Sequence, residues 1–401
     1  MKILVLNSGS SSLKFKLYRM PEKELLAEGL IERIGEESSA IHLHYGSERY
    51  DTEAALADHS AALSRLERLL PELGILESFR DLGGVGHRVV HGGEAFSAPV
   101  RIDAEVVETI RRLIPLAPLH NPANLLGIEA MQKRAPELPQ VAVFDTAFHQ
   151  SMPPEAYRYA VPQEWYTRHG VRRYGFHGTS HAYVARRCAE LMDRDPAGLR
   201  LITLHLGNGA SACAVQGGQS VETSMGLTPL EGLVMGTRSG DIDPAIPFYM
   251  NKYGSLSIEE IETQLNKASG LRGIAGSNDM REIQERRASG DEAAALAFDI
   301  FIHRLVKYVG AYAALLGRLD ALVFTGGIGE HSAPVRQALC ERLEILGIAL
   351  DKEANDAPTP AERPLHTPHS RVQLWVLPTD EEGMIAEATY GIVAMPTPNS
   401  A

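Results

Sequence analysis

The sequence predicts an α/β protein made of two related domains with a cleft between them. The chain has 401 residues, more than one compact core usually holds, so two domains are expected. Short apolar segments alternate with segments of helical spacing, which is typical of α/β proteins. The plan of residues 2–12 recurs at residues 202–212 as a strand, a turn of Gly, Ser or Asn, and a second strand, with Gly9 aligned to Gly209. A repeat half a chain apart favours a duplicated domain over the alternative of two unrelated hairpins.

The individual elements follow from hydrophobic periodicity and from capping residues. Short apolar runs predict strands at residues 2–6, 13–18, 84–90, 141–144, 201–206, 321–325 and 374–377. Helices are predicted at residues 54–70, 291–316 and 382–393, and the Ala-rich 291–316 helix is expected to be central and buried. Capping signals predict three more helices: one that begins at Thr179 or Ser180 and runs to about Met192, one with a capping box of Ser257 and Glu260, and one capped by Ser332 with Pro334 in its first turn.

The composition excludes several classes of function. Net charge is −12, from 39 basic and 51 acidic residues, so nucleic acid is not expected as a partner, because phosphate backbones select basic surfaces. No stretch reaches the roughly 20 apolar residues that a membrane helix needs, and the start of the chain lacks the apolar region of a signal peptide. Cys188, Cys213 and Cys340 show neither disulfide nor metal-site spacing. We therefore expect a cytoplasmic protein with no membrane partner.

Four glycine-rich turns, each after an apolar strand, predict phosphate binding. They lie at residues 7–12, 91–93, 207–209 and 326–329. Small residues let backbone N–H groups approach an anion, and four such turns at strand ends favour a nucleotide site over ordinary hairpins. None of them matches the Walker A pattern or a dinucleotide fingerprint, so a different phosphate-binding fold is expected.

Three basic residues are candidates for contacts with phosphate or substrate. Lys14 lies two residues past the first turn, where it either reaches a phosphate or is solvated on its strand. Arg88 lies beside valines on a predicted inner strand, where burial requires an anionic partner. Arg238 lies in a charged loop, where it either clamps a phosphoryl group or forms a structural ion pair with Asp241 or Asp243.

A histidine and a set of oxygen ligands complete the candidate site. His177 lies in a glycine-flanked turn just before a predicted helix, a place that stabilises negative charge, whereas His181 fits the helix start itself. Asp145 follows a buried strand, and acidic residues at such ends point into the clefts of α/β sheets. Asn7 and Glu381 are candidate Mg²⁺ ligands, with capping of the following turn or helix as the alternative for each.

Eight segments together resemble the acetate kinase family. They are residues 7–14 (Asn-Ser-Gly-Ser-Ser-Ser-Leu-Lys), 86–93 (Gly-His-Arg-Val-Val-His-Gly-Gly), 119–122 (Leu-His-Asn-Pro), 144–149 (Phe-Asp-Thr-Ala-Phe-His), 173–181 (Arg-Tyr-Gly-Phe-His-Gly-Thr-Ser-His), 205–209 (His-Leu-Gly-Asn-Gly), 236–244 (Gly-Thr-Arg-Ser-Gly-Asp-Ile-Asp-Pro) and 324–330 (Phe-Thr-Gly-Gly-Ile-Gly-Glu). Their order and spacing are similar to that family from residue 1 to about residue 393. One mild departure is at residues 378–382 (Pro-Thr-Asp-Glu-Glu), where the family commonly has Asn before the glutamates.

The resemblance implies the duplicated fold of sugar kinases, Hsp70 and actin, in which two actin-like (ribonuclease H-like) α/β domains flank a nucleotide and substrate cleft. The N-terminal domain would comprise residues 1–147 and 383–401, and residues 148–382 would form the second domain with most of the nucleotide site. The implied reaction is reversible, Mg²⁺-dependent transfer of the γ-phosphoryl group of ATP to acetate, giving acetyl phosphate and ADP, with Mn²⁺ able to substitute. A homodimer is expected from the family.

The resemblance also implies roles for residues at matching positions. The catalytic residues would be Asp145, His177 and Arg238. Substrate would contact Arg88 and His120, with an apolar pocket for the acetate methyl formed by Val90, Leu119, Phe176 and Pro229. Magnesium would bind Asn7 and Glu381. ATP would contact Ser10, Ser12, Lys14, His205, Leu206, Gly207, Asn208, Gly209, Asp279, Met280, Arg281, Gly326, Gly327, Ile328, Gly329 and Glu330.

The chemistry of a carboxylate acceptor sharpens these roles. Carboxyl groups of this kind have a pKa of ~4, so acetate is already ionised at neutral pH and needs no general base. We therefore interpret Asp145 as positioning Mg²⁺ or an arginine, with direct in-line transfer driven by positioning and charge neutralisation. A propionate or butyrate kinase is the nearest alternative, because an apolar pocket discriminates one methylene by only about 10–200-fold. A nucleotide-driven conformational protein is a different class, and a buried substrate arginine such as Arg88 argues against it.

Overall fold

The computed structural model describes residues 1–357 and 361–395. This part of the chain divides into two compact units, residues 1–147 with 380–395, and Phe148–Thr379. The chain thus re-enters its first unit at residue 380, three residues before the boundary expected at 382/383. The portion of that expected domain beyond residue 395 lies outside the described residues. No helix in the described ranges combines the length and apolar character needed to cross a membrane.

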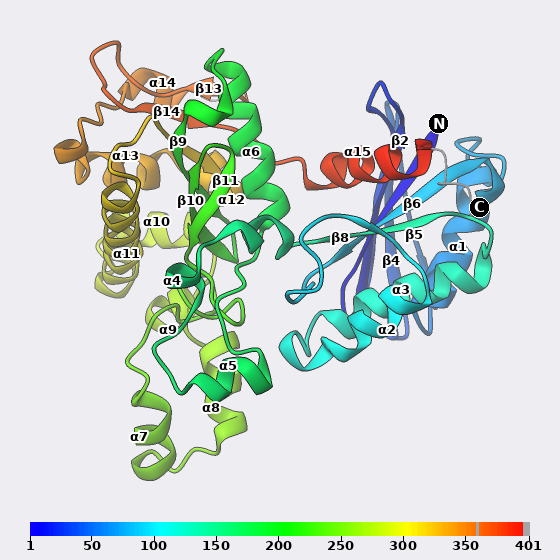
Figure 1. Ribbon diagram of the computed structural model, residues 1–401, viewed down its shortest axis with the longest axis horizontal. Helices are drawn as coiled ribbons and strands as arrows, with labels where there is room; N and C mark the ends of the chain where they lie inside the picture. Colours follow the sequence, from blue (N-terminus) through cyan, green and yellow to red (C-terminus); the bar gives the residue numbers. More distant parts are fainter. Residues whose placement is uncertain (358–360, 396–401) are drawn as a thin grey trace. The chain divides into compact units, whose positions relative to one another are not determined.

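An eight-stranded sheet forms the centre of the first unit (Figure 1). Its strands lie in the order β5-β4-β3-β2-β1-β6-β8-β7. β1 pairs antiparallel with β2 and parallel with β6, and β6 pairs parallel with β8. The carboxyl ends of β1, β6 and β8 therefore lie at one edge of the sheet. The strands are β1 (Lys2–Ser8), β2 (Ser12–Arg19), β3 (Glu24–Glu32), β4 (Ser39–Tyr45), β5 (Glu48–Ala54), β6 (Leu82–Val89), β7 (Val100–Arg101) and β8 (Gln140–Phe144).

Helices cover both faces of this sheet because successive residues of a strand point to opposite sides. Leu4 and Leu6 of β1 pack in a core with α1 and the end of α3. Ile3 and Val5 face the other way and pack against Ile385 of the C-terminal helix α15. The helices of this unit are α1 (His59–Glu72), α2 (Ala104–Arg112), α3 (Asn121–Arg134) and α15 (Glu381–Ala394).

A six-stranded sheet, in the order β11-β10-β9-β12-β14-β13, forms the centre of the second unit. α6 packs on β9 and β12, and the long helix α11 packs on β9 and β10 (Figure 1). The strands are β9 (Arg200–Leu206), β10 (Ala210–Gln216), β11 (Gln219–Thr223), β12 (Ala321–Thr325), β13 (Arg363–Pro364) and β14 (Gln373–Val376). The helices are α4 (Pro154–Tyr157), α5 (Gln163–His169), α6 (Gly178–Leu191), α7 (Ile246–Tyr253), α8 (Ile258–Lys267), α9 (Gly270–Ala275), α10 (Met280–Ala288), α11 (Glu292–Leu316), α12 (Gly326–His331), α13 (Ala333–Glu341) and α14 (Lys352–Asp356).

The two sheets share one topology. Five strands of the first lie in the order β3-β2-β1-β6-β8, and five of the second in the order β11-β10-β9-β12-β14. In each set the two hairpin pairings are antiparallel and the next two pairings are parallel. The repeated segments at residues 2–12 and 202–212 occupy the equivalent hairpins β1–β2 and β9–β10. The predicted duplication is therefore confirmed, and the alternative of unrelated hairpins is wrong.

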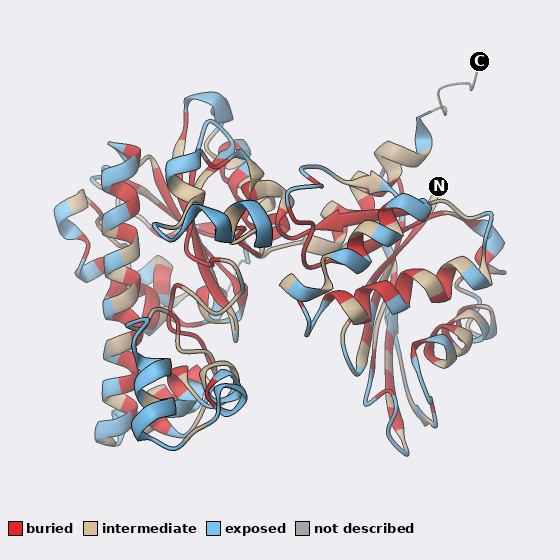
Figure 2. Cartoon of the chain, turned by 60° about the horizontal axis from the view of Figure 1, so that its bottom comes forward, coloured by how far each residue is buried: buried red, intermediate tan, exposed pale blue. Residues whose placement is uncertain are grey.

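Several predicted element boundaries need correction. Ala54 ends β5, and α1 begins only at His59, with Asp58 as its N-cap. α6 is capped by His177, so Thr179 and Ser180 lie inside its first turn. α11 buries only one face, and Leu296 and Leu315 on its other side are 55% and 66% exposed, so it is not a fully buried helix. Figure 2 shows the same division, with buried residues along the strands and the sheet-facing sides of the helices. The predicted capping residues at Ser257 with Glu260 and at Ser332 are confirmed.

Candidate functional site

In the first unit, Arg88 and Asp145 form a two-pronged ion pair at the sheet edge. Arg88 is near the end of β6 and Asp145 directly follows the neighbouring parallel strand β8, so both reach the same edge. Nε of Arg88 donates to Oδ1 of Asp145 at 3.0 Å and Nη2 donates to Oδ2 at 2.6 Å. The Asp145 side chain is 2% exposed and that of Arg88 is 23% exposed. The anionic partner predicted for a buried Arg88 is thus a carboxylate of the protein itself.

Glu381 and Glu382, at the start of α15, add negative charge beside this pair. Oε2 of Glu381 lies 3.8 Å from Nε of Arg88. Burial opposes the charge of Arg88, but the nearby carboxylates of Asp145 and Glu381 outweigh it and raise the pKa of that guanidinium. Burial raises the pKa of Glu381, Arg88 lowers it, and the charges of Asp145 and Glu382 raise it further. Burial first, and then the neighbouring carboxylates, thus hold the pKa of Glu381 above its usual value, and a cation at this position would relieve both effects.

Lys14 contacts protein in this structure. Its Nζ lies 2.6 Å from Oε1 of Glu382, and Lys16 lies 3.7 Å from the other oxygen of the same carboxylate. The Lys14 side chain is still 46% exposed. Asn7 lies opposite Lys14 in the β1–β2 register. Among residues 1–357 and 361–395, no cluster of three or more His, Cys, Asp or Glu side chains is arranged to hold a metal. Mg²⁺ is in general bound by one or two carboxylates together with substrate phosphates and water.

Two buried asparagines of α3 fix the ends of β1 and β6. Nδ2 of Asn124 donates to the carbonyl of Ser8 at 2.8 Å, and its Oδ1 accepts from the backbone of Val90 at 3.0 Å. Asn121 accepts from the backbone N–H of His91 and donates to its carbonyl. Sequence reasoning included Asn121 in a motif but missed Asn124, whose signal is an amide within an otherwise apolar stretch of helix. These bonds hold the first two glycine-rich turns in place.

The residues predicted to enclose a methyl group differ in exposure. In the first unit, Val90 is buried, whereas Leu119 is 59% exposed and His120 is also exposed. In the second unit, Phe176 is buried and Pro229 is partly exposed. The carbonyl of Phe176 accepts a hydrogen bond from Nε2 of His149 at 3.0 Å. The pocket itself remains a prediction.

In the second unit, His177 caps the N-terminus of α6 with a left-handed backbone. Its φ is 56°, which non-glycine residues rarely adopt. Nδ1 lies 2.9 Å from Oγ of Ser211 on β10, and the ring stacks on His205 with centroids 4.2 Å apart. The imidazole is therefore held in one orientation at the positive end of a helix, where negative charge is stabilised.

Arg238 has no carboxylate partner within 4.0 Å in the described parts of the chain, and its Nη1 donates to the carbonyl of Pro229 at 2.7 Å. The alternative of an ion pair with Asp241 or Asp243 is wrong. Asp241 instead lies 3.0 Å from Arg304 and accepts from Tyr308, and Asp243 accepts from the backbone of Ala245. Burial lowers the pKa of Arg238, as expected for a cation without a counter-charge.

Arg238 and His177 converge on the turn between β9 and β10. A methyl group placed on Gly209 would lie 2.9 Å from Nη2 of Arg238 and 3.5 Å from Nε2 of His177. The loop that carries Arg238 is tied to this turn, because the backbone N–H of Gly236 donates to the carbonyl of Asn208 at 3.0 Å. A charged donor and an imidazole edge thus meet beside a glycine, an arrangement suited to a developing negative charge.

A cavity of about 460 Å³ in the second unit collects many of the predicted ATP contacts. This volume is within the usual range for small-molecule sites, about 300–1,000 Å³. Met280 and Ile328 give it apolar surface, and Asp279, Arg281 and the amides give it polar groups. Its lining residues are Gly207, Asn208, Asn278, Asp279, Met280, Arg281, Gln284, Gly327, Ile328, His331 and Ser332.

Other predicted ATP contacts have structural roles in this unit or lie apart from the cavity lining. Gly326 has a φ of 77°, and a side chain there would meet the carbonyl of Leu206 at 2.8 Å. Glu330 accepts from the backbone N–H of Gly326, the first residue of α12, at 2.9 Å, which satisfies this amide at the start of the helix. His205, Leu206, Gly209 and Gly329 do not line the cavity. Ser10 and Ser12 lie in the first unit: Ser10 is in the turn between β1 and β2, and Ser12 is the first residue of β2.

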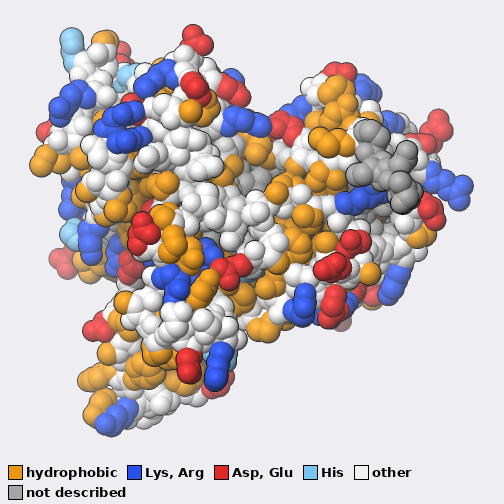
Figure 3. Space-filling model, viewed as in Figure 1, with side chains coloured by type: hydrophobic (Ala, Val, Ile, Leu, Met, Phe, Trp, Pro, Cys, Tyr) orange, Lys and Arg blue, Asp and Glu red, His pale blue; other side chains and the backbone are white. Residues whose placement is uncertain are grey.

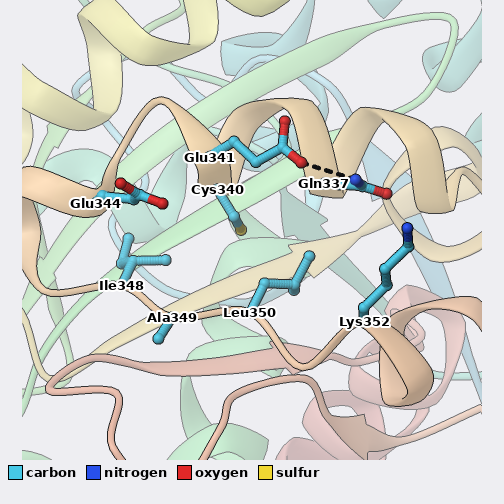
Figure 4. Close-up of a pocket in the computed structure, with 8 residues that line it drawn as sticks. All are labelled: Gln337, Cys340, Glu341, Glu344, Ile348, Ala349, Leu350 and Lys352. Carbon is cyan, nitrogen blue, oxygen red and sulfur yellow. Dashed lines mark hydrogen bonds between the residues drawn. The ribbon is translucent and has the colours of Figure 1, made fainter.

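A second cavity in the second unit, of about 410 Å³, has no predicted site residue among its lining residues (Figure 4). It is bounded by Cys340, Ile348, Leu350 and their neighbours, and its polar groups include Glu341, which accepts from Gln337 at 2.7 Å. No anion-binding cation other than Lys352 lines it in the described chain. It is therefore a poor candidate for a phosphate site.

Comparison with known proteins gives a consistent result over the whole length. A profile of the Acetokinase family matches residues 2–387. The acetate kinase of Streptomyces coelicolor is 55% identical over 395 residues, covering 98% of this chain and 97% of the relative. The acetate kinase of Deinococcus radiodurans is 54% identical over 392 residues, covering 97% and 98%.

Solved structures show the same fold. The acetate kinase of Porphyromonas gingivalis has a TM-score of 0.93 and 45% identity, covering 98% of this chain and 99% of its own. A propionate kinase of Francisella tularensis has a TM-score of 0.92 and 45% identity, covering 97% and 99%. With the repeated topology of the two sheets, these likenesses confirm the predicted duplicated, actin-like α/β fold. Because the profile spans nearly the whole chain and relatives more than half identical cover it, the chain belongs to the acetokinase family.

Proposed function

We propose that this protein is an acetate kinase: it transfers the γ-phosphoryl group of ATP to acetate in the presence of Mg²⁺, giving acetyl phosphate and ADP. The observation that carries the proposal is that Arg238 is partly buried and has no counter-charge in the described parts of the chain. Its partly buried guanidinium has no carboxylate partner within 4.0 Å in the described residues, and it converges with His177 on Gly209. An unpaired cation of this kind fits a transferring phosphoryl group better than a structural role does. Family membership supplies the acceptor, since the relatives from Streptomyces coelicolor and Deinococcus radiodurans, each more than half identical, are named acetate kinases.

The nucleotide is assigned to the second unit. The cavity at residues 207–208, 278–284 and 327–332 would hold the adenosine, with Met280 and Ile328 against the base. The remaining glycine-rich turn residues, with Ser10, Ser12 and Lys14 of the first unit, would contact phosphates. Lys14 would have to leave Glu382 to do so, and its 46% exposure allows that movement.

The carboxylate and the metal are assigned to the first unit. Arg88 would contact the acceptor carboxylate while remaining paired with Asp145, and Val90 would contact the methyl group. Asn7 and Glu381 would hold Mg²⁺ together with phosphate and water oxygens, and this ion would neutralise charge on the phosphates. The excess of carboxylates around Arg88 supports a cation at this position. Asp145 would orient Arg88 and would not accept a proton.

A homodimer is also proposed, with α7 in its interface. Ile246, Phe248, Tyr249 and Tyr253 of this helix are 42%, 71%, 62% and 65% exposed. Figure 3 shows hydrophobic side chains gathered on the corresponding lower part of the molecule. An exposed apolar cluster of this kind favours contact with another protein surface. We further propose a cytoplasmic location, where ATP and Mg²⁺ are both present.

The decisive test of the activity is to trap the product. Purified protein with ATP, Mg²⁺ and acetate should form acetyl phosphate, which hydroxylamine converts to acetyl hydroxamate, and omission of acetate should abolish the product. Release of ADP that does not depend on any carboxylate would instead favour the nucleotide-driven conformational class.

Propionate is the second candidate acceptor, favoured by the near-equal likeness to a propionate kinase structure. One more buried methylene would contribute about 0.8 kcal/mol if space exists, whereas overpacking costs about 1–3 kcal/mol. We expect kcat/KM to fall from acetate to propionate to butyrate, and Val90→Ala to lower the KM for propionate. A wild-type preference for propionate would make the second candidate the correct one.

A further inference from the structure

A chain of hydrogen bonds runs from His177 into the interior of the second unit. Nδ1 of His177 lies 2.9 Å from Oγ of Ser211, and the same hydroxyl lies 2.8 Å from Nε2 of His181. Nδ1 of His181 lies 2.7 Å from Oγ1 of Thr203. Three contacts therefore connect a residue of the candidate reaction centre to the middle of β9. The roles proposed above use only the first of these residues.

This chain of hydrogen bonds exists because one face of the sheet is polar where the start of α6 packs on it. In the β9–β10 register His205 lies opposite Ser211 and Thr203 lies opposite Cys213, so these side chains share a face. Further along the same face, Leu201 and Val215 join an apolar core with Val184 and Cys188 of α6. The polar residues thus interrupt a surface that is otherwise built for apolar packing.

Polar side chains buried in this otherwise apolar face lower the stability of the fold unless each of them is hydrogen-bonded. His181, Ser211 and Thr203 are each 0% exposed. Buried polar groups without partners destabilise a protein, and apolar residues would pack here more simply. His181 lies four residues after His177, one turn further along the same side of the helix. His181 can therefore hold His177 in place through the hydroxyl of Ser211, which contacts both rings.

Proton counting gives the chain a direction. Burial and the neighbouring His149 and His205 lower the pKa of His181, so it is neutral and has one N–H and one acceptor nitrogen. In one arrangement Thr203 donates to Nδ1 of His181, Nε2–H of His181 donates to Ser211, and Ser211 donates to Nδ1 of His177. In the reverse arrangement His177 donates from Nδ1, and a neutral His177 then has a lone pair on Nε2.

We propose that Thr203, His181 and Ser211 are positioning residues that hold His177 in the tautomer with its proton on Nε2. This inference rests on the proposed phosphoryl transfer. The Nε2 edge of His177 faces the point where it converges with Arg238, at 3.5 Å and 2.9 Å from a methyl group placed on Gly209. A phosphoryl oxygen at such a point needs donors on both sides, and a lone pair on Nε2 would repel it. The first arrangement supplies the donor, with Ser211 accepting one bond and donating one.

Nitrogen-15 NMR of the imidazole rings reads the tautomer without any turnover. The full chain would be labelled at histidine, and His177→Gln would assign the signal of His177. With Mg²⁺ and a non-hydrolysable ATP analogue, we expect the wild-type signal of the Nε2–H tautomer, and a mixture of tautomers in Ser211→Ala. A proton on Nδ1 in the wild type, or the same signal in both proteins, would overturn the proposal.

Substitutions at the far end of the chain separate positioning from packing. Thr203→Val keeps the shape and removes the hydroxyl, so kcat should fall about tenfold with little change in KM. Thr203→Ser keeps the hydroxyl and removes a methyl group, so it should retain kcat within about twofold even where its Tm falls. Thr223→Val is the matched control, because the buried hydroxyl of Thr223 donates to the carbonyl of Ala212 and takes no part in the hydrogen bonds between Thr203 and His177. The kcat of this variant should not change. A larger loss of kcat in Thr203→Ser than in Thr203→Val would show a packing role and contradict us.

A double variant tests whether the chain acts through His177. Ser211→Ala should lower kcat in the wild-type background and cause no further loss in His177→Ala, since coupled residues are not additive. A full additional loss in that background would refute the inference. The tests also separate the two proposals: absence of acetyl phosphate in the wild type would reject the proposed function, whereas normal activity with an unchanged tautomer in Ser211→Ala would reject only the positioning chain.

Discussion

A single methyl group on Gly209 should disable phosphoryl transfer while leaving the fold intact. An ideal Cβ there would lie 2.9 Å from Nη2 of Arg238, 3.4 Å from Cε1 of His177 and 3.5 Å from its Nε2. Non-bonded heavy atoms prefer separations of about 3.5–4.0 Å, so the imidazole can stay, but the guanidinium has to move by roughly 0.5–1 Å. Gly209→Ala is therefore a small, directed displacement of one proposed reacting group.

The two expected effects of Gly209→Ala differ greatly in size. A misplacement of about 1 Å can cost about 10²-fold in rate, or about 2.7 kcal/mol of transition-state stabilisation, so kcat should fall about 10- to 100-fold. The contact is with the end of a flexible side chain, and Gly209 is not among the glycines with positive φ. Alanine at a compatible backbone position stabilises a protein by about 0.4–1 kcal/mol, so Tm should be unchanged or slightly higher.

The assay is formation of acetyl hydroxamate, with thermal melting measured on the same samples. Gly310→Ala is the control, because a Cβ at that position of α11 would meet nothing within 4 Å. It should keep full activity and raise stability by about 1 kcal/mol, the preference of a helix for alanine over glycine. Full activity of Gly209→Ala, or an equal loss of activity in Gly310→Ala, would refute the convergence of Arg238 and His177 as the reacting centre.

Three further predictions address the metal side, acid stability and assembly. Asp145→Asn keeps the shape but leaves Arg88 without its counter-charge, so kcat should fall about 10²–10³-fold, and steady-state rates that recover at high pH would show a base role instead. Burial lowers the pKa of His149 from its ordinary 6.5 to about 4. Between these two pH values His149 is protonated in the unfolded chain but not in the folded one, so the free energy of unfolding is highest above pH 6.5 and falls as pH decreases toward 4. Urea unfolding should therefore give a smaller free energy at pH 5 than at pH 7, with a smaller difference in His149→Gln, and an unaltered difference would contradict the assignment. Phe248→Asp should convert a dimer into monomers in sedimentation velocity with the fold retained, and a wild-type protein that sediments as a monomer would reject the proposed interface.

The fold was predictable where burial produces a continuous apolar run. β1, β9 and β12 lie inside their sheets, so most of their residues are buried and each contains a short apolar run that is visible in the sequence. β3, β4 and β5 were missed, because they are partly exposed and carry charged residues, as in Glu48–Ala54. The start of α1 was misplaced for the same reason, since the exposed end of β5 reads as an extension of the helix.

The candidate site was less predictable because its partners are distant in sequence. Arg238 lies in a charged loop, so the sequence alone is consistent with an ion pair between Arg238 and Asp241. The folded chain shows that the carboxylate of Asp241 instead contacts Arg304 and Tyr308. His181 reads as a helix start, and its bonds to Ser211 and Thr203 depend on the β9–β10 register. Local patterns thus indicate which residues are polar at strand and helix ends, whereas the pairing among them comes from tertiary structure.

The most direct test of the account is single-turnover transfer of labelled phosphate. Wild-type protein would be mixed rapidly with ATP labelled at the γ-position, Mg²⁺ and acetate, then quenched at successive times. The label should pass from ATP to acetyl phosphate with no label on the protein, and in Arg238→Ala the transfer step should slow about 10²–10³-fold at saturating ATP. Label that appears first on the protein, or an unchanged transfer rate in Arg238→Ala, would contradict direct transfer at this centre.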